Sequence, residues 1–217
     1  MSIVIVGAGP NLGLAVARRF GREGFSVGLI SRTQSKLDDL AAQLEGEGIT
    51  AAGAAADIRD AQALAAAIEA LADRLGEVEV LEYSPLPARE FMKPILETTV
   101  DDVRGPLAFS VLGAVAAARA VIGPMLDRGS GTILYTTGGA AINPYPPRAG
   151  VGISFAGEVA YARMLHDEVK GRGVHVVHTA IGGRIAPGAD HEPDDVAETL
   201  WRHHTERDTF QTIIGIG

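Results

Sequence analysis

The sequence predicts an α/β fold built on a doubly wound parallel sheet, and three observations support this. Short apolar runs alternate with segments of helical periodicity along the 217 residues. The first run, Val4–Val6, breaks at Gly7 and is followed at once by a helical pattern through Phe20, which is the order strand, glycine turn, helix. Neither a repeat nor a linker interrupts the alternation, so we expect a single domain over residues 1–217.

The remaining elements follow in the same rhythm. Strands are expected at residues 25–30, 49–56, 78–83, 132–137, 174–180 and 210–214. Helices are expected at residues 37–46, 61–75, 107–127, 149–170 and 193–201, with one short helix at 99–104. Asp60 is expected to cap the helix that Gly76 ends. Such repeated alternation is typical of parallel strands joined by right-handed helical crossovers.

Composition excludes several classes of protein. The net charge of −8 disfavours a nucleic-acid partner or an anionic membrane surface. The chain has no cysteine, which removes disulfides and thiolate chemistry, and its six histidines show no metal-binding pattern, so no metal site is expected. The first strand begins at about Ser2 without a charged leader, and no apolar run was found long enough to span a bilayer. A soluble, cytoplasmic protein is expected.

The glycine turn after the first strand is the strongest candidate for a binding site. Glycines allow the backbone to come close to a pyrophosphate, whose charge the free N–H groups at the start of the next helix can bind. The alternative interpretation is a tight turn without a ligand. The candidate residues of this turn are Gly7, Gly9, Pro10, Asn11, Leu12 and Gly13.

The end of the second strand indicates which dinucleotide would bind. An acidic residue at such a position holds the ribose hydroxyls of NAD, but this strand ends in Ser31-Arg32-Thr33. A guanidinium suits a 2′-phosphate instead, so Arg32, with Ser31 beside it, favours NADP(H) over NAD(H). The alternative is a solvated arginine at a strand end.

Together these features resemble the short-chain dehydrogenase/reductase family over essentially the whole chain. The resemblance is carried by residues 7–13, 56–58, 123–126 and 131–134 and by the turn after the sixth strand. It implies a Rossmann-type sheet of about seven strands and a bound nicotinamide cofactor. Asn11 stands where the family has its middle glycine, and Asn tolerates left-handed backbone angles. The resemblance adds four candidate cofactor contacts: Asp57 at the adenine-binding position, Ile58, Ser84 and Pro85.

The catalytic positions differ from the family pattern. That pattern has a Ser after the fifth strand, a Tyr thirteen residues later, a Lys four further on, and a helper Asn. Here these positions fall on Gly138, Val151, Phe155 and Ser110. No Tyr-x-x-x-Lys occurs anywhere in the chain, and Val151 and Phe155 share a helix face on which no titratable group is expected. Tyr145, in a nearby loop, is a candidate proton donor, although loop tyrosines more often pack at the surface.

Three functions remain open at this point. The first is an atypical oxidoreductase that acts on an activated acceptor such as an enone or an iminium. The second is a catalytically inactive cofactor-binding or partner subunit, and the third is a non-redox enzyme that reuses the cleft. The small-residue helices at 107–127 and 149–170 and the family resemblance both favour a homodimer or homotetramer.

Overall fold

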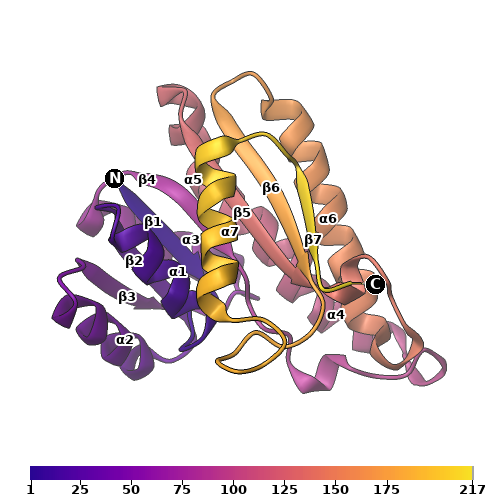
Figure 1. Cartoon of the computed structure of the whole chain (residues 1–217). Coiled ribbons are helices and arrows are strands. Elements are labelled where there is room, and N and C mark those ends of the chain that lie inside the picture. The colour runs from indigo at the N-terminus through magenta and orange to yellow at the C-terminus, as the bar shows by residue number, and fades with distance from the viewer. Residues whose placement is uncertain (217) are drawn as a thin grey trace.

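The computed structural model of the chain describes residues 1–216 and contains one seven-stranded sheet (Figure 1). The strand order is β3-β2-β1-β4-β5-β6-β7, and every pairing is parallel, which confirms the predicted fold. All carboxyl ends of the strands therefore meet at one edge of the sheet. The strands are β1 (Ser2–Val6), β2 (Ser26–Ser31), β3 (Ala51–Ala55), β4 (Val78–Tyr83), β5 (Gly131–Gly138), β6 (Val174–Ile181) and β7 (Gln211–Ile214).

Helices cover both faces of the sheet. The α-helices are α1 (Leu12–Gly21), α2 (Gln34–Gly46), α3 (Ala61–Leu75), α4 (Val100–Leu107), α5 (Gly113–Arg128), α6 (Ala149–Val169) and α7 (Pro193–Glu206). Side chains of α1, α2 and α7 form one buried apolar cluster with the sheet, and those of α3, α5 and α6 form another. Figure 1 shows α1 and α7 in front of the strands and α6 behind them.

Both ends of α3 follow from local chemistry. The Asp60 carboxylate accepts hydrogen bonds from the N–H groups of Gln62 and Ala63, both at 3.0 Å, and thus caps α3 as predicted. Gly76 ends that helix with a φ of +91°, as its lack of a Cβ allows.

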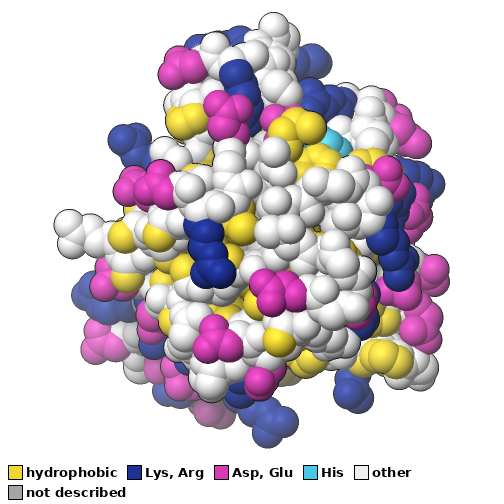
Figure 2. All heavy atoms as spheres, turned by 90° about the vertical axis from the view of Figure 1, so that its left-hand side faces the viewer, with side chains coloured by type: hydrophobic (Ala, Val, Ile, Leu, Met, Phe, Trp, Pro, Cys, Tyr) yellow, Lys and Arg dark blue, Asp and Glu magenta, His cyan; other side chains and the backbone are white. Residues whose placement is uncertain are grey.

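On the surface at the side of β3 and α2, acidic and basic side chains are mixed, without a continuous patch of one charge (Figure 2).

The helix predicted at 107–127 begins earlier and is not uniform. Thr99 and Asp102 form a reciprocal capping box that starts α4, and the chain stays helical through Arg128. Between α4 and α5 lies a π-helical turn, Ala108–Leu112. It follows Pro106, whose missing N–H interrupts the regular bonding, and the buried Tyr83 hydroxyl donates a hydrogen bond to the Phe109 carbonyl within the turn. The hydrogen bond from Tyr83 comes from a distant segment, so helical periodicity alone does not record it.

The continuous helical segment from residue 100 to residue 128 contradicts the expectation that no apolar run is long enough to span a bilayer. Among the described residues it is the one helical segment whose length and composition would allow it to cross a membrane. By itself this is weak support for a membrane span, because core helices of soluble proteins meet the same criterion. Ala114, Ala117 and Val121 of this segment are buried in the core beside α3.

Candidate functional site

The glycine turn between β1 and α1 lies against the ends of two other strands. The N–H groups of Gly7 and Ala8 both donate to the Ile30 carbonyl of β2, at 2.9 and 3.0 Å. Gly7 has a φ of +98°, and a Cβ at this position would lie 2.6 Å from the Pro85 Cα that follows β4. Only glycine combines this positive φ with the absence of a Cβ. The turn is therefore held where the carboxyl ends of β1, β2 and β4 meet.

The rest of the turn opens toward this edge. Space around Gly9 is free, and Pro10 and Asn11 are exposed, whereas a Cβ on Gly13 would meet the Ala8 Cα at 3.0 Å. Asn11 has a φ of −98°, so the tolerance for left-handed angles expected of it is not used. Helix α1 begins at Leu12. The N–H groups of Leu14 and Ala15 donate to the carbonyls of Gly9 and Asn11, so within the described chain those of Leu12 and Gly13 are left without a carbonyl partner. They form the anion-binding end of the helix dipole at the sheet edge.

Three charged side chains meet beyond the ends of β2 and β3. Arg32 is exposed and forms no ion pair within residues 1–216. The Arg59 guanidinium pairs with the Asp57 carboxylate at 2.7 Å, and this hydrogen bonding lowers the pKa of Asp57, with a smaller contribution from Arg32. Arg59 is not among the residues predicted from the sequence, although it stands only two residues after Asp57. Ser31 is partly buried and Ile58 buried beside this group.

Three of the four positions matched to the family's catalytic residues come together in an apolar patch. Val151 and Phe155 of α6 pack with Phe91 and Ala140 in a buried cluster. A Cβ added to Gly138 would lie 3.4 Å from the Phe155 ring. The patch therefore places buried hydrocarbon and aromatic side chains, and no polar ones, at the end of β5.

Beneath this patch lies a carboxyl group that was not predicted from the sequence. Glu158 stands seven residues after Val151 and three after Phe155, so it shares their face of α6, and the expectation of no titratable group there is wrong. It is 2% exposed, and burial raises its pKa well above the usual value, against a smaller lowering by the Ser110 hydroxyl. Within residues 1–216 neither Glu158 Oε1 nor Ser110 Oγ has a hydrogen-bond partner. The i, i+4, i+7 spacing of Val151, Phe155 and Glu158 could have predicted from the sequence that Glu158 shares this helix face.

A second buried carboxyl group lies below the end of β4. Glu82 is fully buried, and its Oε2 accepts a hydrogen bond of 2.9 Å from the Ser84 hydroxyl. Burial raises its pKa to about 8, although the hydroxyls of Ser84 and Thr136 act in the opposite direction. Glu82 is therefore mostly protonated at neutral pH. Ser84 and Pro85, both partly buried, link this acid to the glycine turn.

Tyr145, the candidate proton donor, lies at the surface rather than in the buried apolar patch. It is 42% exposed and lines a hollow of about 250 Å³ that also contains Ile95 and Ile153. The Arg148 guanidinium lies 5.3 Å from its ring centre. Among the described residues, no group of three or more His, Asp or Glu side chains could hold a metal ion.

These features define a class of protein. The strand order reverses at β1 and β4, and a glycine turn and a helix N-terminus lie at that reversal, as in dinucleotide-binding proteins of the Rossmann type. A family model described as short chain dehydrogenase matches residues 1–193. The chain therefore belongs to the short-chain dehydrogenase family, a family of oxidoreductases that are generally soluble.

Relatives and solved structures agree with this assignment. The chain is 30% identical to D-threitol dehydrogenase of Mycolicibacterium smegmatis over 80% of its own length and 66% of that protein. It is 25% identical to dehydrogenase/reductase SDR family member 4 of Sus scrofa over 98% of its length and 73% of that protein. A short-chain dehydrogenase structure from Rhodopseudomonas palustris is 27% identical, with a TM-score of 0.87 and coverage of 98% and 97%.

A more distant structure shares the fold alone. L-Sorbose reductase from Gluconobacter frateurii, solved with NADPH and L-sorbose, has a TM-score of 0.89 at 20% identity and covers 100% of this chain and 95% of its own.

We predict that Gly7→Ala destabilises the protein more than Gly24→Ala does. Both glycines have a φ near +90°, but a Cβ on Gly24 meets nothing within 4 Å, whereas one on Gly7 meets the Pro85 backbone. Gly24→Ala should cost about 1–2 kcal/mol for the left-handed backbone alone. Gly7→Ala should cost at least about 1 kcal/mol more, measured by urea unfolding. Equal losses would contradict the close contact.

We predict that Glu82→Gln changes how stability depends on pH. The usual carboxyl pKa of 4.5 applies to the unfolded chain, whereas the folded value is about 8, so between these values the folded protein holds more protons. The free energy of unfolding of the wild type should therefore fall with rising pH, by up to about 1.4 kcal/mol per unit from this group. The difference between variant and wild type, measured from pH 5 to 9, isolates this contribution.

The control is Glu69→Gln, because Glu69 is exposed on α3. Its stability curve should run parallel to that of the wild type. A parallel curve for Glu82→Gln as well would show that Glu82 is ionised in the folded protein at these pH values.

Proposed function

We propose that this chain is a cytoplasmic, NADP(H)-dependent oxidoreductase that acts on an activated small-molecule acceptor without the family's Ser, Tyr and Lys. One observation supports it most: the Gly7 turn and Arg32 lie at the carboxyl edge of the sheet, while the matched catalytic positions form an apolar patch at the end of β5. The substrates of related proteins do not identify the acceptor.

The residues at the sheet edge fit such a cofactor. The first turn of α1 offers N–H groups and a positive dipole end for the pyrophosphate. Arg32 offers a guanidinium without an ion pair in the described chain for the 2′-phosphate, and Arg59 adds positive charge nearby. Asp57 is held in place by Arg59, and its carboxylate oxygens can accept from an adenine amino group. When bound, the nicotinamide supplies or accepts the hydride.

The apolar patch restricts the acceptors that can react. A simple ketone gains negative charge on oxygen as hydride arrives, which requires a proton donor or hydrogen-bond donors at that oxygen. Val151 and Phe155 are buried in the apolar patch, where they exclude water and donate no hydrogen bond. Glu158 is buried behind them and Ser110 with it. An enone or an iminium needs less help, because it carries its own activation.

Two other functions keep specific support. A catalytically inactive cofactor-binding or partner subunit is favoured by the replacement of all the catalytic positions together. A non-redox enzyme that reuses the cleft would draw on the two protonated carboxyl groups, Glu82 and Glu158, at the end of β4 and behind the patch.

We predict a tenfold or greater preference for NADPH that depends on Arg32. Arg32→Ala should weaken NADPH binding by about 1–3 kcal/mol and leave NADH binding nearly unchanged, because only NADPH carries the 2′-phosphate. Fluorescence titration with both cofactors measures this. Arg74→Ala, which removes an exposed cation on α3, is the matched control and should bind like the wild type. Equal affinity of the wild type for the two cofactors would contradict the assignment.

We predict turnover of activated acceptors and little turnover of plain ketones or alcohols. A missing general acid typically costs about 10²–10⁴-fold in rate. NADPH absorbance would be followed over a panel of ketones, quinones, enones and cyclic imines. Val151→Tyr should not restore ketone reduction, because Phe155 supplies no cation to lower the tyrosine pKa. Fast ketone turnover by the wild type would refute this proposal, and inactivity across the panel would favour the inactive subunit.

We also predict a homodimer or homotetramer formed through α5 and α6. Ile153, Ala160 and Met164 stand at i, i+7 and i+11 and form an exposed stripe along α6. The small residues of α5 and α6 would allow a helix of another subunit to approach closely. Met164→Glu should lower the mass measured by light scattering, whereas Leu96→Glu, at an exposed position outside these helices, should not. A monomer mass for the wild type at all concentrations would exclude this assembly.

A further inference from the structure

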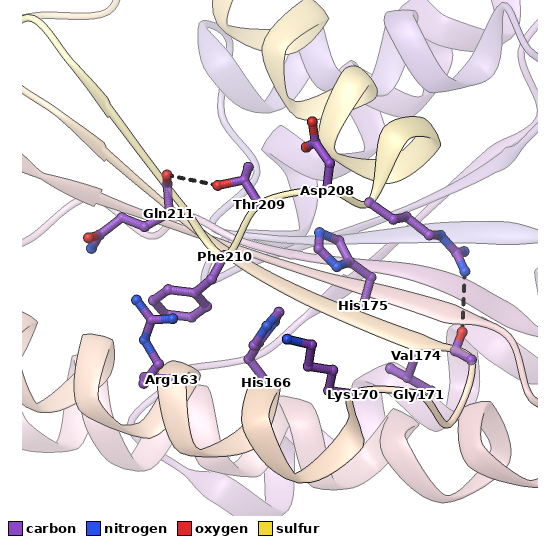
Figure 3. Close-up of a pocket in the computed structure, with 12 residues that line it drawn as sticks. Arg163, His166, Lys170, Gly171, Val174, His175, Asp208, Thr209, Phe210 and Gln211 are labelled. Atoms are coloured by element: carbon purple, nitrogen blue, oxygen red, sulfur yellow. Dashed lines mark hydrogen bonds between the residues drawn. The ribbon is translucent and has the colours of Figure 1, made fainter.

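A groove of about 660 Å³ lies at the opposite edge of the sheet from the candidate cofactor site (Figure 3). It is bounded by the last turns of α6, the residues that lead into β6 and the connection from α7 to β7. Since β6 and β7 begin here, the groove is at the amino ends of these strands. The glycine turn and Arg32 are at the carboxyl ends of their strands, so the two sites are separate.

Positive charge is concentrated in this groove. Arg163, Lys170 and Arg207 line it together with one carboxylate, Asp208, and Arg207 also forms an ion pair with Glu79 outside the lining. Neither Arg163 nor Lys170 forms an ion pair in the part of the chain that the structure describes. This excess of cations is unexpected in a protein whose net charge is −8.

Helix dipoles explain only part of this arrangement. Lys170 and Arg207 stand at the C-caps of α6 and α7, where cations are favoured by the negative end of the helix dipole. Arg163 is about two turns before the end of α6, too far for that effect. Its guanidinium lies 3.6 Å from the centre of the Phe210 ring, so stacking holds the side chain over the groove.

Arg207 is held in place by its surroundings. It has a φ of +52°, the one positive φ outside glycine among the described residues. Its guanidinium donates to the carbonyls of Gly173 and His204, at 3.2 and 3.1 Å, and lies 3.6 Å from Glu79. The backbone conformation and these contacts position a cation beside the groove.

A buried imidazole that lines the groove has one ring nitrogen without a hydrogen-bond partner. His175 is 7% exposed, and its Nε2 has no partner within residues 1–216. Burial, followed by the nearby His166, Arg207 and His203, lowers its pKa to about 4, although Asp208 acts in the opposite direction. The neutral ring can donate one N–H from Nε2. A buried polar atom of this kind normally has a partner, so a ligand atom is the natural candidate.

We propose that this groove binds a small anion that carries phosphate groups. The guanidinium of Arg163 offers paired donors, the ammonium of Lys170 offers a mobile charge, and His175 offers a donor at the buried side. The groove has room for a diphosphate or a phosphorylated metabolite. This proposal is independent of the proposed redox function, because it uses none of the residues at the glycine turn.

The test is calorimetric titration of the full chain with inorganic pyrophosphate at constant ionic strength. Arg163→Gln and Lys170→Gln should each weaken binding at least tenfold, and Arg163→Lys should weaken it less than Arg163→Gln. Arg74→Gln, which removes one exposed charge elsewhere, should bind like the wild type. Arg32→Ala should also leave binding unchanged, which separates this groove from the cofactor site whether or not NADPH binds.

A second measurement locates the ligand. In NMR spectra, pyrophosphate should shift the His175 imidazole signals and the amides of residues 170–173 and 208–211. Shifts confined to residues 7–13, no binding, or an equal loss in Arg74→Gln would overturn the proposal. So would a fall to a smaller oligomer in both Arg163→Gln and Lys170→Gln by light scattering, since the groove would then belong to contacts between copies of the chain.

Discussion

The contact between the Gly7 backbone and the end of β4 is the constraint on which the candidate cofactor site depends. No side chain fits between Gly7 and Pro85, and the N–H groups of Gly7 and Ala8 are bound to the Ile30 carbonyl of β2. The turn therefore cannot move without breaking its hydrogen bonds or the sheet. Helix α1 begins five residues after Gly7, so its positive dipole end is fixed at the reversal of the strand order.

Two buried carboxyl groups distinguish the region behind this site. Glu82 and Glu158 are both more than nine-tenths buried and both hold their protons well above the usual pKa. Such groups are costly to retain in a protein core unless they are neutral or hydrogen-bonded. The apolar patch of Val151 and Phe155 thus has acids behind it rather than at its surface. This arrangement is compatible with a site that holds an apolar substrate and leaves its activation to the substrate.

The two edges of the sheet have different chemistry because all strands run in the same direction. The first turn of α1 and the ends of the strands meet at the carboxyl edge, where a dinucleotide fits. The ends of α6 and α7 meet at the amino edge, where cations are favoured near the negative ends of the dipoles. The helix dipoles do not account for the stacking of Arg163 on Phe210 or for the unpartnered nitrogen of His175.

The sequence by itself determined the succession of strands and helices along the chain, the glycine turn and the position of Arg32, because periodicity and turn chemistry are local properties. Only the tertiary structure decided the features that depend on distant segments. Tyr83 meets the π-helical turn before α5, Arg59 pairs with Asp57, and Glu82 loses its charge through burial. The groove at the amino edge was also not predictable. Its cations come from segments about forty residues apart, and desolvation depends on packing that no local pattern records.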